Sequence, residues 1–185
     1  MKHYNELFIK QCCQADRKAQ KLLFDDLYAP MFRIVYRYIN KQAEAEDCVM
    51  KGFMKLFQNL DKFRFKGEHS LFVWTRRIMV NEALMFLRQN HNFLLSLESD
   101  HHEITIQNEV LQKIEAEALN DLIMSLPTGY RTVFNLSVVE GYDHKQIAET
   151  LGISQSTSRT QLAKAKNKLR IMLQQKDLKN ERFGE

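Results

Sequence analysis

The stretch Asp143–Arg170 reads DHKQIAETLGISQSTSRTQLAKAKNKLR and decides the fold of the C-terminal part of the chain. Asp143 and Gln146 stand three residues apart, which is the spacing of a capping box at the start of a helix. Gly152 suits the left-handed residue that ends a helix, and Ser154 suits the cap of the next helix. Two helices joined by a short glycine-containing turn predict a helix-turn-helix.

The second helix of this motif, expected over Gln155–Arg170, divides into two faces. Ser158, Leu162, Ala165 and Leu169 are spaced for one buried face. Five basic residues and no acidic residue lie between Ser154 and Arg170, which suits contacts with bases in a major groove and with phosphates. The residues expected to bind duplex DNA are Gln155, Ser156, Arg159, Thr160, Ala163, Lys164 and Lys166. The alternative is a solvated basic helix at the end of a domain.

The rest of the chain repeats apolar residues at helical spacing, and no strand pattern competes with helix. Helices are expected over residues 16–40, with a break or kink at Pro30, and over residues 47–60. A third helix is expected to follow Ser70 as its N-cap and to run to about Arg88. Its expected buried residues are Trp74, Ile78, Ala83, Leu84 and Leu87.

A polar stretch with weak periodicity, residues 89–108, separates these helices from the C-terminal ones. An amphipathic helix is expected over residues 110–123 and a short helix over residues 130–139. The fold class is therefore predicted as all-α, with two small helical domains. The predicted domains are residues 1–90 and 109–185, and residues 91–108 are the predicted linker.

Composition and charge narrow the classes of function for these 185 residues. No apolar run is long enough for a transmembrane helix, the N-terminus lacks a signal core, and the three cysteines lack metal or disulfide spacing. A reduced cytoplasm is therefore expected. Residues 1–92 carry a net charge of +6, residues 93–125 carry −6 and residues 126–185 carry +4. Two basic blocks suit two contacts along one polyanion, although solvated helix faces would give the same totals.

The segment Lys62–His69 interleaves aromatic and basic residues between two expected helices. Aromatic rings that stack on bases, beside cations that follow the backbone, are typical of single-stranded nucleic acid binding. The candidate residues are Lys62, Phe63, Arg64, Phe65, Lys66 and His69, with Arg76 and Asn81 on the following helix. The alternative places Phe63, Phe65 and Trp74 in the core.

About residues 10–173 resemble an extracytoplasmic-function (ECF) sigma factor of the sigma-70 superfamily, a small class of bacterial RNA polymerase subunit. AEDCVMKGFMKLFQNLDKF (residues 45–63) resembles the family's polymerase-clamp helix, and GEHSLFVWTRRIMVNEALMFLR (residues 67–88) resembles its promoter-melting helix. LPTGYRTVFNLSVVEGYDHKQIAETLGISQSTSRTQLAKAKNKLR (residues 126–170) is similar to the domain that reads the minus-thirty-five element.

The resemblance implies a dissociable specificity subunit without a catalytic role or cofactor. Its first domain would bind core RNA polymerase and open the minus-ten element, and its second would read the minus-thirty-five element of promoter DNA. An anti-sigma factor is the further partner that the resemblance implies, and membrane insertion is not expected. The implied polymerase-binding residues are Asp47, Met50, Lys51, Met54 and Gln58. The chain departs from the family pattern at Lys51-Gly52, at Ser158, at Ala163 and in a longer Lys62–His69 segment.

Three other classes of protein compete with this interpretation. The sequence does not support an enzymatic function, because the histidines lack the spacing of metal ligands and no common catalytic motif is present. A dimeric helix-turn-helix regulator that binds duplex operator DNA would explain the C-terminal domain but not the N-terminal helices. A helical adaptor that docks an acidic partner would lack salt-dependent affinity for DNA.

Overall fold

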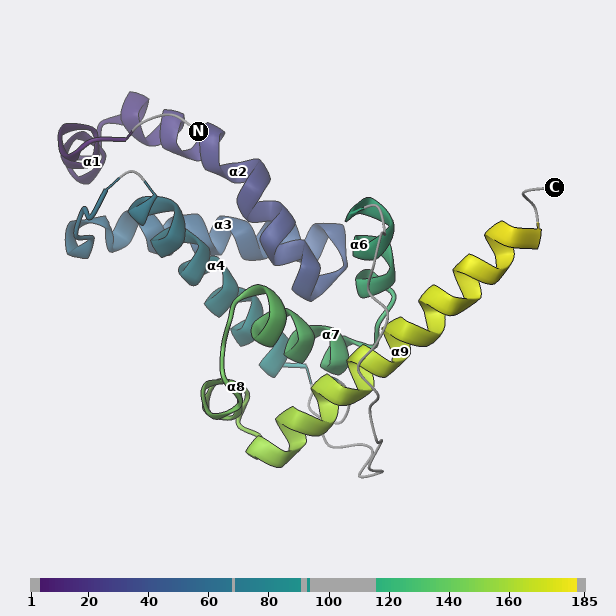
Figure 1. Ribbon diagram of the computed structural model, residues 1–185. Coiled ribbons are helices and arrows are strands. Elements are labelled where there is room, and N and C mark those ends of the chain that lie inside the picture. Colours follow the sequence, from purple (N-terminus) through teal and green to yellow (C-terminus); the bar gives the residue numbers. More distant parts are fainter. Residues whose placement is uncertain (1–3, 68, 91–92, 94–115, 183–185) are drawn as a thin grey trace. The chain divides into compact units, whose positions relative to one another are not determined.

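The computed structural model describes residues 4–67, 69–90, 93 and 116–182 (Figure 1). Every regular element within these ranges is helical, so the all-α prediction is confirmed. The chain divides into two compact units between Gln89 and Asn90. Most of the predicted linker, residues 91–108, lies outside the described residues, as does the start of the helix expected over residues 110–123.

The first unit is built on three long helices that pack against one another: α2 (Arg17–Ile39), α3 (Gln42–Gln58) and α4 (Ser70–Arg88). The short helix α1 (Glu6–Cys13) packs on α2, and the 3-10 turn η1 (Leu60–Lys62) follows α3 (Figure 1). Side chains from all three long helices form the core, because each helix carries an apolar stripe. The largest of the fully buried ones are Leu23, Leu27, Met31, Tyr38, Phe53, Leu56, Leu71 and Met79.

The break expected at Pro30 does not occur, because α2 continues through this residue. A proline inside a helix removes one backbone hydrogen bond and costs about 3 kcal/mol. Leu27, Met31 and Val35 flank it and are fully or almost fully buried. Burial of each such side chain contributes about 1.5–3 kcal/mol, so packing offsets the cost of the proline.

The start and the buried face of α4 also differ from the prediction. Ser70 is the first helical residue instead of the cap, and its hydroxyl donates to the Gly67 carbonyl at 2.6 Å. Trp74 and Ile78 are half-buried, whereas Ala83, Leu84 and Leu87 are buried as expected. The core-facing stripe includes Leu71, Thr75 and Met79, which are turned by one residue from the predicted stripe.

Gly52 marks the close approach of α3 to α4. A Cβ at this position would overlap the sulfur of Met79, whose side chain is fully buried. We expect Gly52→Ala to lower the free energy of unfolding by about 1–2 kcal/mol, because overpacking outweighs the gain in helix propensity. Chemical denaturation measures this change, with the exposed neighbour Lys51→Ala as control. A Met79→Val substitution in the Gly52→Ala background should recover stability, and no recovery would contradict the proposed overlap.

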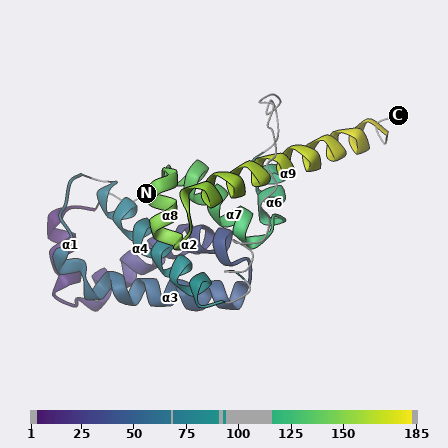
Figure 2. The ribbon, with the colours of Figure 1, turned by 90° about the horizontal axis from the view of Figure 1, so that it is seen from below.

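The second unit consists of α6 (Ala116–Met124), α7 (Thr128–Phe134) with a π-helical turn η2 (Asn135–Val139), α8 (His144–Leu151) and α9 (Gln155–Arg182). Helix α9 packs on α6, α7 and α8 and continues twelve residues past the predicted end at Arg170 as one helix (Figure 2). The buried Arg131 donates to the carbonyls of Met124 at 3.1 Å and Leu126 at 2.8 Å. These bonds hold the end of α6 against α7, because they satisfy carbonyls that the helix end leaves free.

Candidate nucleic-acid interface

Helices α8 and α9 form the predicted helix-turn-helix, and its local signals are confirmed. The Asp143 carboxylate accepts from the backbone nitrogen of Gln146 at 2.8 Å, and Gln146 Oε1 accepts from the backbone nitrogen of Asp143 at 3.0 Å. Gly152 ends α8 in the left-handed region with φ 71°, where glycine carries no side-chain penalty. The Ser154 hydroxyl accepts from the Thr157 nitrogen at 2.9 Å and caps α9.

The buried face of α9 contains Ser158, Leu162, Ala165 and Leu169, as predicted. The opposite side exposes Gln155, Ser156, Arg159 and Lys166, whereas Thr160 and Ala163 are half-buried. The Arg159 guanidinium donates to the Gln155 side chain at 3.3 Å, so the two polar groups lie together at the start of the helix.

Lys164 differs from the other residues predicted to contact DNA, because it is only 6% exposed. Gln161, one turn earlier, is 2% exposed. Helix α9 packs on α7 as well as on α8, so its buried face is wider than one apolar stripe. Sequence spacing assigned Lys164 to the solvent side because a stripe pattern does not show how many helices surround α9.

Four basic side chains are exposed from the end of η1 to the start of α4: Lys62, Arg64, Lys66 and His69. Phe63 and Phe65 are half-buried, and the ring of Phe63 lies 5.2 Å from that of Trp74, tilted by 40°. Phe63 is thus held by α4, and Phe65 leaves part of its ring to solvent. On α4 itself, Asn81 is exposed and Arg76 is half-buried.

A separate surface lies on the side of α3 that faces away from the core. All five residues predicted to contact the polymerase are exposed there: Asp47, Met50, Lys51, Met54 and Gln58. Met50 is 48% and Met54 is 59% exposed, which is unusual for large apolar side chains. Methionine adapts its shape to a partner, so this face suits a protein contact.

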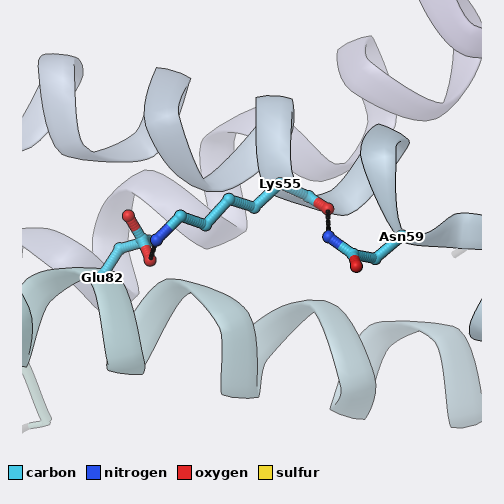
Figure 3. A network of polar contacts seen from close by, with 3 residues as sticks. All are labelled: Lys55, Asn59 and Glu82. Carbon is cyan, nitrogen blue, oxygen red and sulfur yellow. Dashed lines mark hydrogen bonds and ion pairs between the residues drawn. The ribbon is translucent and has the colours of Figure 1, made fainter.

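The ion pair of Lys55 with Glu82 links α3 to α4 and was missed by sequence reasoning (Figure 3). Lys55 Nζ lies 2.5 Å from a Glu82 carboxylate oxygen, and Asn59 donates to the Lys55 carbonyl at 2.9 Å. Glu82 is only 6% exposed, and a buried charge requires a partner. A glutamate among the apolar residues of α4 was the available signal.

Burial, followed by the nearby Glu82, raises the pKa of the Cys48 thiol to about 12, so this thiol stays protonated.

His144 brings a titratable group to the helix-turn-helix. Its Nδ1 lies 2.9 Å from the Ser158 hydroxyl. Burial, and after it the charge of Arg159, lowers the pKa of His144 below 6.5. The neutral imidazole is thus favoured in the folded state.

We expect this lowered pKa to make folding dependent on pH. Because the folded state disfavours the protonated ring, the contribution of His144 to stability is present above pH 6.5 and is lost as the pH falls through the lowered pKa. The melting temperature of the wild type should fall more between pH 7.5 and pH 5.5 than that of His144→Gln. Parallel pH profiles of the two proteins would contradict this assignment.

Within the described ranges, no three histidine, cysteine or acidic side chains gather as a metal site would require. None of the helices described is long and apolar enough to cross a membrane.

Two family models match the chain on the two units described above. Sigma-70 region 2 matches residues 23–93, which include α3, the Lys62–His69 segment and α4. Sigma-70, region 4, matches residues 116–169, which include the helix-turn-helix. The chain belongs to the sigma-70 family and is a sigma factor of the ECF class. Its function is promoter-directed initiation with RNA polymerase, and a dimeric operator-binding regulator is not favoured.

Two curated relatives of this sigma factor align with it over nearly their full length. The ECF RNA polymerase sigma-E factor of Haemophilus influenzae is 24% identical over 92% of this chain and 95% of its own. The ECF RNA polymerase sigma factor SigW of Bacillus subtilis is 25% identical over 89% of this chain and 94% of its own. Among solved structures, the sigma factor RpoE of Bartonella quintana, in complex with the anti-sigma factor NepR, is 17% identical with a TM-score of 0.48 over 83% of this chain and 96% of its own.

Proposed function

We propose that this sigma factor uses three surfaces: α3 for core RNA polymerase, the Lys62–His69 segment for the opened minus-ten element, and α9 for the minus-thirty-five element. The observation that carries the proposal is the division of α9 into a buried side and a polar, basic side. A helix-turn-helix reads duplex DNA with the second helix in the major groove. In this assignment the first unit acts on the polymerase and the melted strand, and the second acts on duplex DNA.

The contact with duplex DNA is assigned to the exposed residues of α9. Arg159 and Gln155 present a guanidinium and an amide, which can bind guanine and adenine edges bidentately. Lys166 lies about two turns further along the helix and is assigned to a phosphate. Lys164 is left out of the DNA-facing set, because it is only 6% exposed.

The contact with the melted strand is assigned to the Lys62–His69 segment, with Arg76 and Asn81 on α4. Unstacking a base costs a few kcal/mol, so an opened strand must gain new contacts. The half-buried ring of Phe65 can stack on an unpaired base, and the exposed cations beside it can neutralise the phosphates next to that base. Phe63 is assigned to support, since its ring already packs on Trp74.

The polymerase contact is assigned to the exposed face of α3, with Met50 and Met54 at its centre and Asp47, Lys51 and Gln58 around them. An apolar centre with a polar rim is the usual anatomy of a protein interface. We further propose that the protein acts in the cytoplasm by binding alone, without catalysis, and that an anti-sigma factor restrains it.

The experiment that tests the proposal is run-off transcription with core polymerase and a library of genomic promoter fragments. We expect promoter-specific transcripts only when the sigma factor is present, together with copurification of the polymerase. The variant Met50→Glu/Met54→Glu should abolish copurification, whereas Met85→Glu, a change at another exposed methionine, should not. Failure of the wild type to direct initiation, or binding of duplex operator DNA without polymerase, would contradict the proposal.

A further inference from the structure

A hydrogen bond between His144 and Ser158 joins the two helices of the helix-turn-helix, and the proposed DNA contacts do not use it. His144 is the first residue of α8, and its Nδ1 lies 2.9 Å from the hydroxyl of Ser158 on α9. Ser158 is fully buried, in line with Leu162 and Ala165. A buried hydroxyl is costly to leave unpaired, so α9 is held where Ser158 meets the imidazole.

Both ends of this hydrogen bond are fixed by their neighbours. The capping box of Asp143 and Gln146 holds the start of α8, where His144 lies. On α9, the Ser158 nitrogen donates to the carbonyl of the capping residue Ser154 at 3.0 Å. A hydrogen bond depends on direction as well as distance, whereas apolar contact does not. The pair therefore restricts rotation of the first turns of α9 more than an apolar pair would.

We propose that His144 is a positioning residue for recognition of the minus-thirty-five element, and that it acts through Ser158 on the turn of α9 that carries Gln155 and Arg159. The proposal rests on the base-reading role proposed above for α9. Arg159 follows Ser158 directly, and its guanidinium lies 3.3 Å from the Gln155 side chain. The hydrogen bond between His144 and Ser158 is thus within one helical turn of both residues proposed to read bases, Gln155 and Arg159.

The geometry of a helix gives the size of the effect. A rotation of α9 by about 20° would move an atom at the outer radius of the helix, about 5–6 Å from its axis, by about 2 Å. Hydrogen bonds weaken steeply beyond a few tenths of an ångström, so a bidentate contact with a base would be lost. Contacts with phosphates would change less, because they depend on charge more than on direction.

The charge state of His144 should make the position of Arg159 depend on pH. The charged groups that act on the imidazole are Asp143 at the start of α8, and Arg159 and Lys166 on α9. Protonation of the ring would place a third cation beside Arg159 and Lys166. Repulsion would then displace Arg159 from its position, and discrimination between bases would decrease as the pH falls.

The test measures discrimination by the complete holoenzyme. Core polymerase with each sigma variant transcribes a mixture of two templates, a promoter that the wild type selects and the same promoter with its upstream element replaced. The ratio of the two transcripts cancels attraction to phosphates, since both templates carry the same number. We expect His144→Ala and Ser158→Ala each to lower this ratio about fivefold to tenfold, and the double variant to lower it no further, because both remove one shared bond.

Matched variants distinguish a loss of the position of α9 from a loss of folding stability. His144→Gln keeps a hydrogen-bonding group without titrating, so it should retain most of the discrimination and lose the dependence on pH that the wild type shows below about pH 6.5. Lys145→Ala, an exposed neighbour on α8, should keep the wild-type ratio. All ratios are measured at a temperature where thermal unfolding shows every variant folded. Should His144→Ala not fold, Ser158→Ala carries the test.

Wild-type discrimination by folded His144→Ala and Ser158→Ala, with only their melting temperatures lowered, would overturn the proposal and leave the pair as a structural contact. Arg159→Ala provides the separate test of the base-reading role. If Arg159→Ala keeps the wild-type ratio, α9 does not read the element through this residue, and that outcome is recognised independently of the His144 variants.

Discussion

Replacing Phe65, Lys66 and His69 together by alanine is expected to abolish promoter opening while polymerase binding and folding are retained. The three side chains lie in the segment between η1 and α4, where Lys66 and His69 are exposed and Phe65 is half-buried. Loss of a stacking ring is worth about 1–3 kcal/mol per base, and loss of the positive charge of Lys66 adds to it. Because strand separation is only just offset by such contacts, the open complex should not accumulate.

Permanganate reactivity of promoter thymines in the reconstituted holoenzyme measures this opening directly. The matched control is Phe65→Tyr/Lys66→Arg, which keeps an aromatic ring and a positive charge and should open the promoter normally. Ser70 remains in place in both variants, so its hydroxyl still accepts from the Lys66 backbone nitrogen at 3.1 Å and keeps the loop backbone together. Wild-type reactivity in the triple alanine variant would show that strand capture lies elsewhere.

Arg159→Ala should weaken and relax recognition of the minus-thirty-five element. Arg159 is exposed on the polar side of α9, and a lost bidentate base contact costs about 1–3 kcal/mol, or roughly fivefold to 160-fold in preference. Lys166→Ala should instead weaken all upstream sequences to a similar extent, since a phosphate contact carries no sequence information. Competition between promoters with single substitutions in the upstream element measures both effects. The same uniform loss for both variants would contradict the assignment of base-reading and phosphate-binding residues.

The helix-turn-helix could be predicted in detail because its determinants are local. A capping box, a left-handed glycine and a serine cap each act within four residues, so they need no knowledge of the rest of the fold. The same holds for the exposed face of α3, since its buried stripe of Cys48, Val49 and Phe53 places Met50 and Met54 on the other side. The sigma-70 family came from the resemblance of whole segments to that family, which the two family models confirm.

Residues whose surroundings come from distant parts of the chain could not be predicted in this way. Lys164 looked exposed by spacing, but it is only 6% exposed in the structure, and a periodic pattern does not reveal what surrounds a helix. Pro30 looked like a helix breaker, but burial of its neighbours keeps α2 continuous. At Pro30 a local cost of a few kcal/mol is offset by the burial of apolar side chains that pack against other helices.

The amino-acid sequence by itself determined most of the helical elements, the helix-turn-helix and the exposed side of α3, because caps, turns and periodicity act over a few residues. Only the tertiary structure decided which polar groups pair across helices. Lys55 finds Glu82 twenty-seven residues away, and His144 finds Ser158 fourteen residues away. These pairings depend on how two helices cross, and crossing is set by the shapes of all the side chains between them, such as Met79 against Gly52.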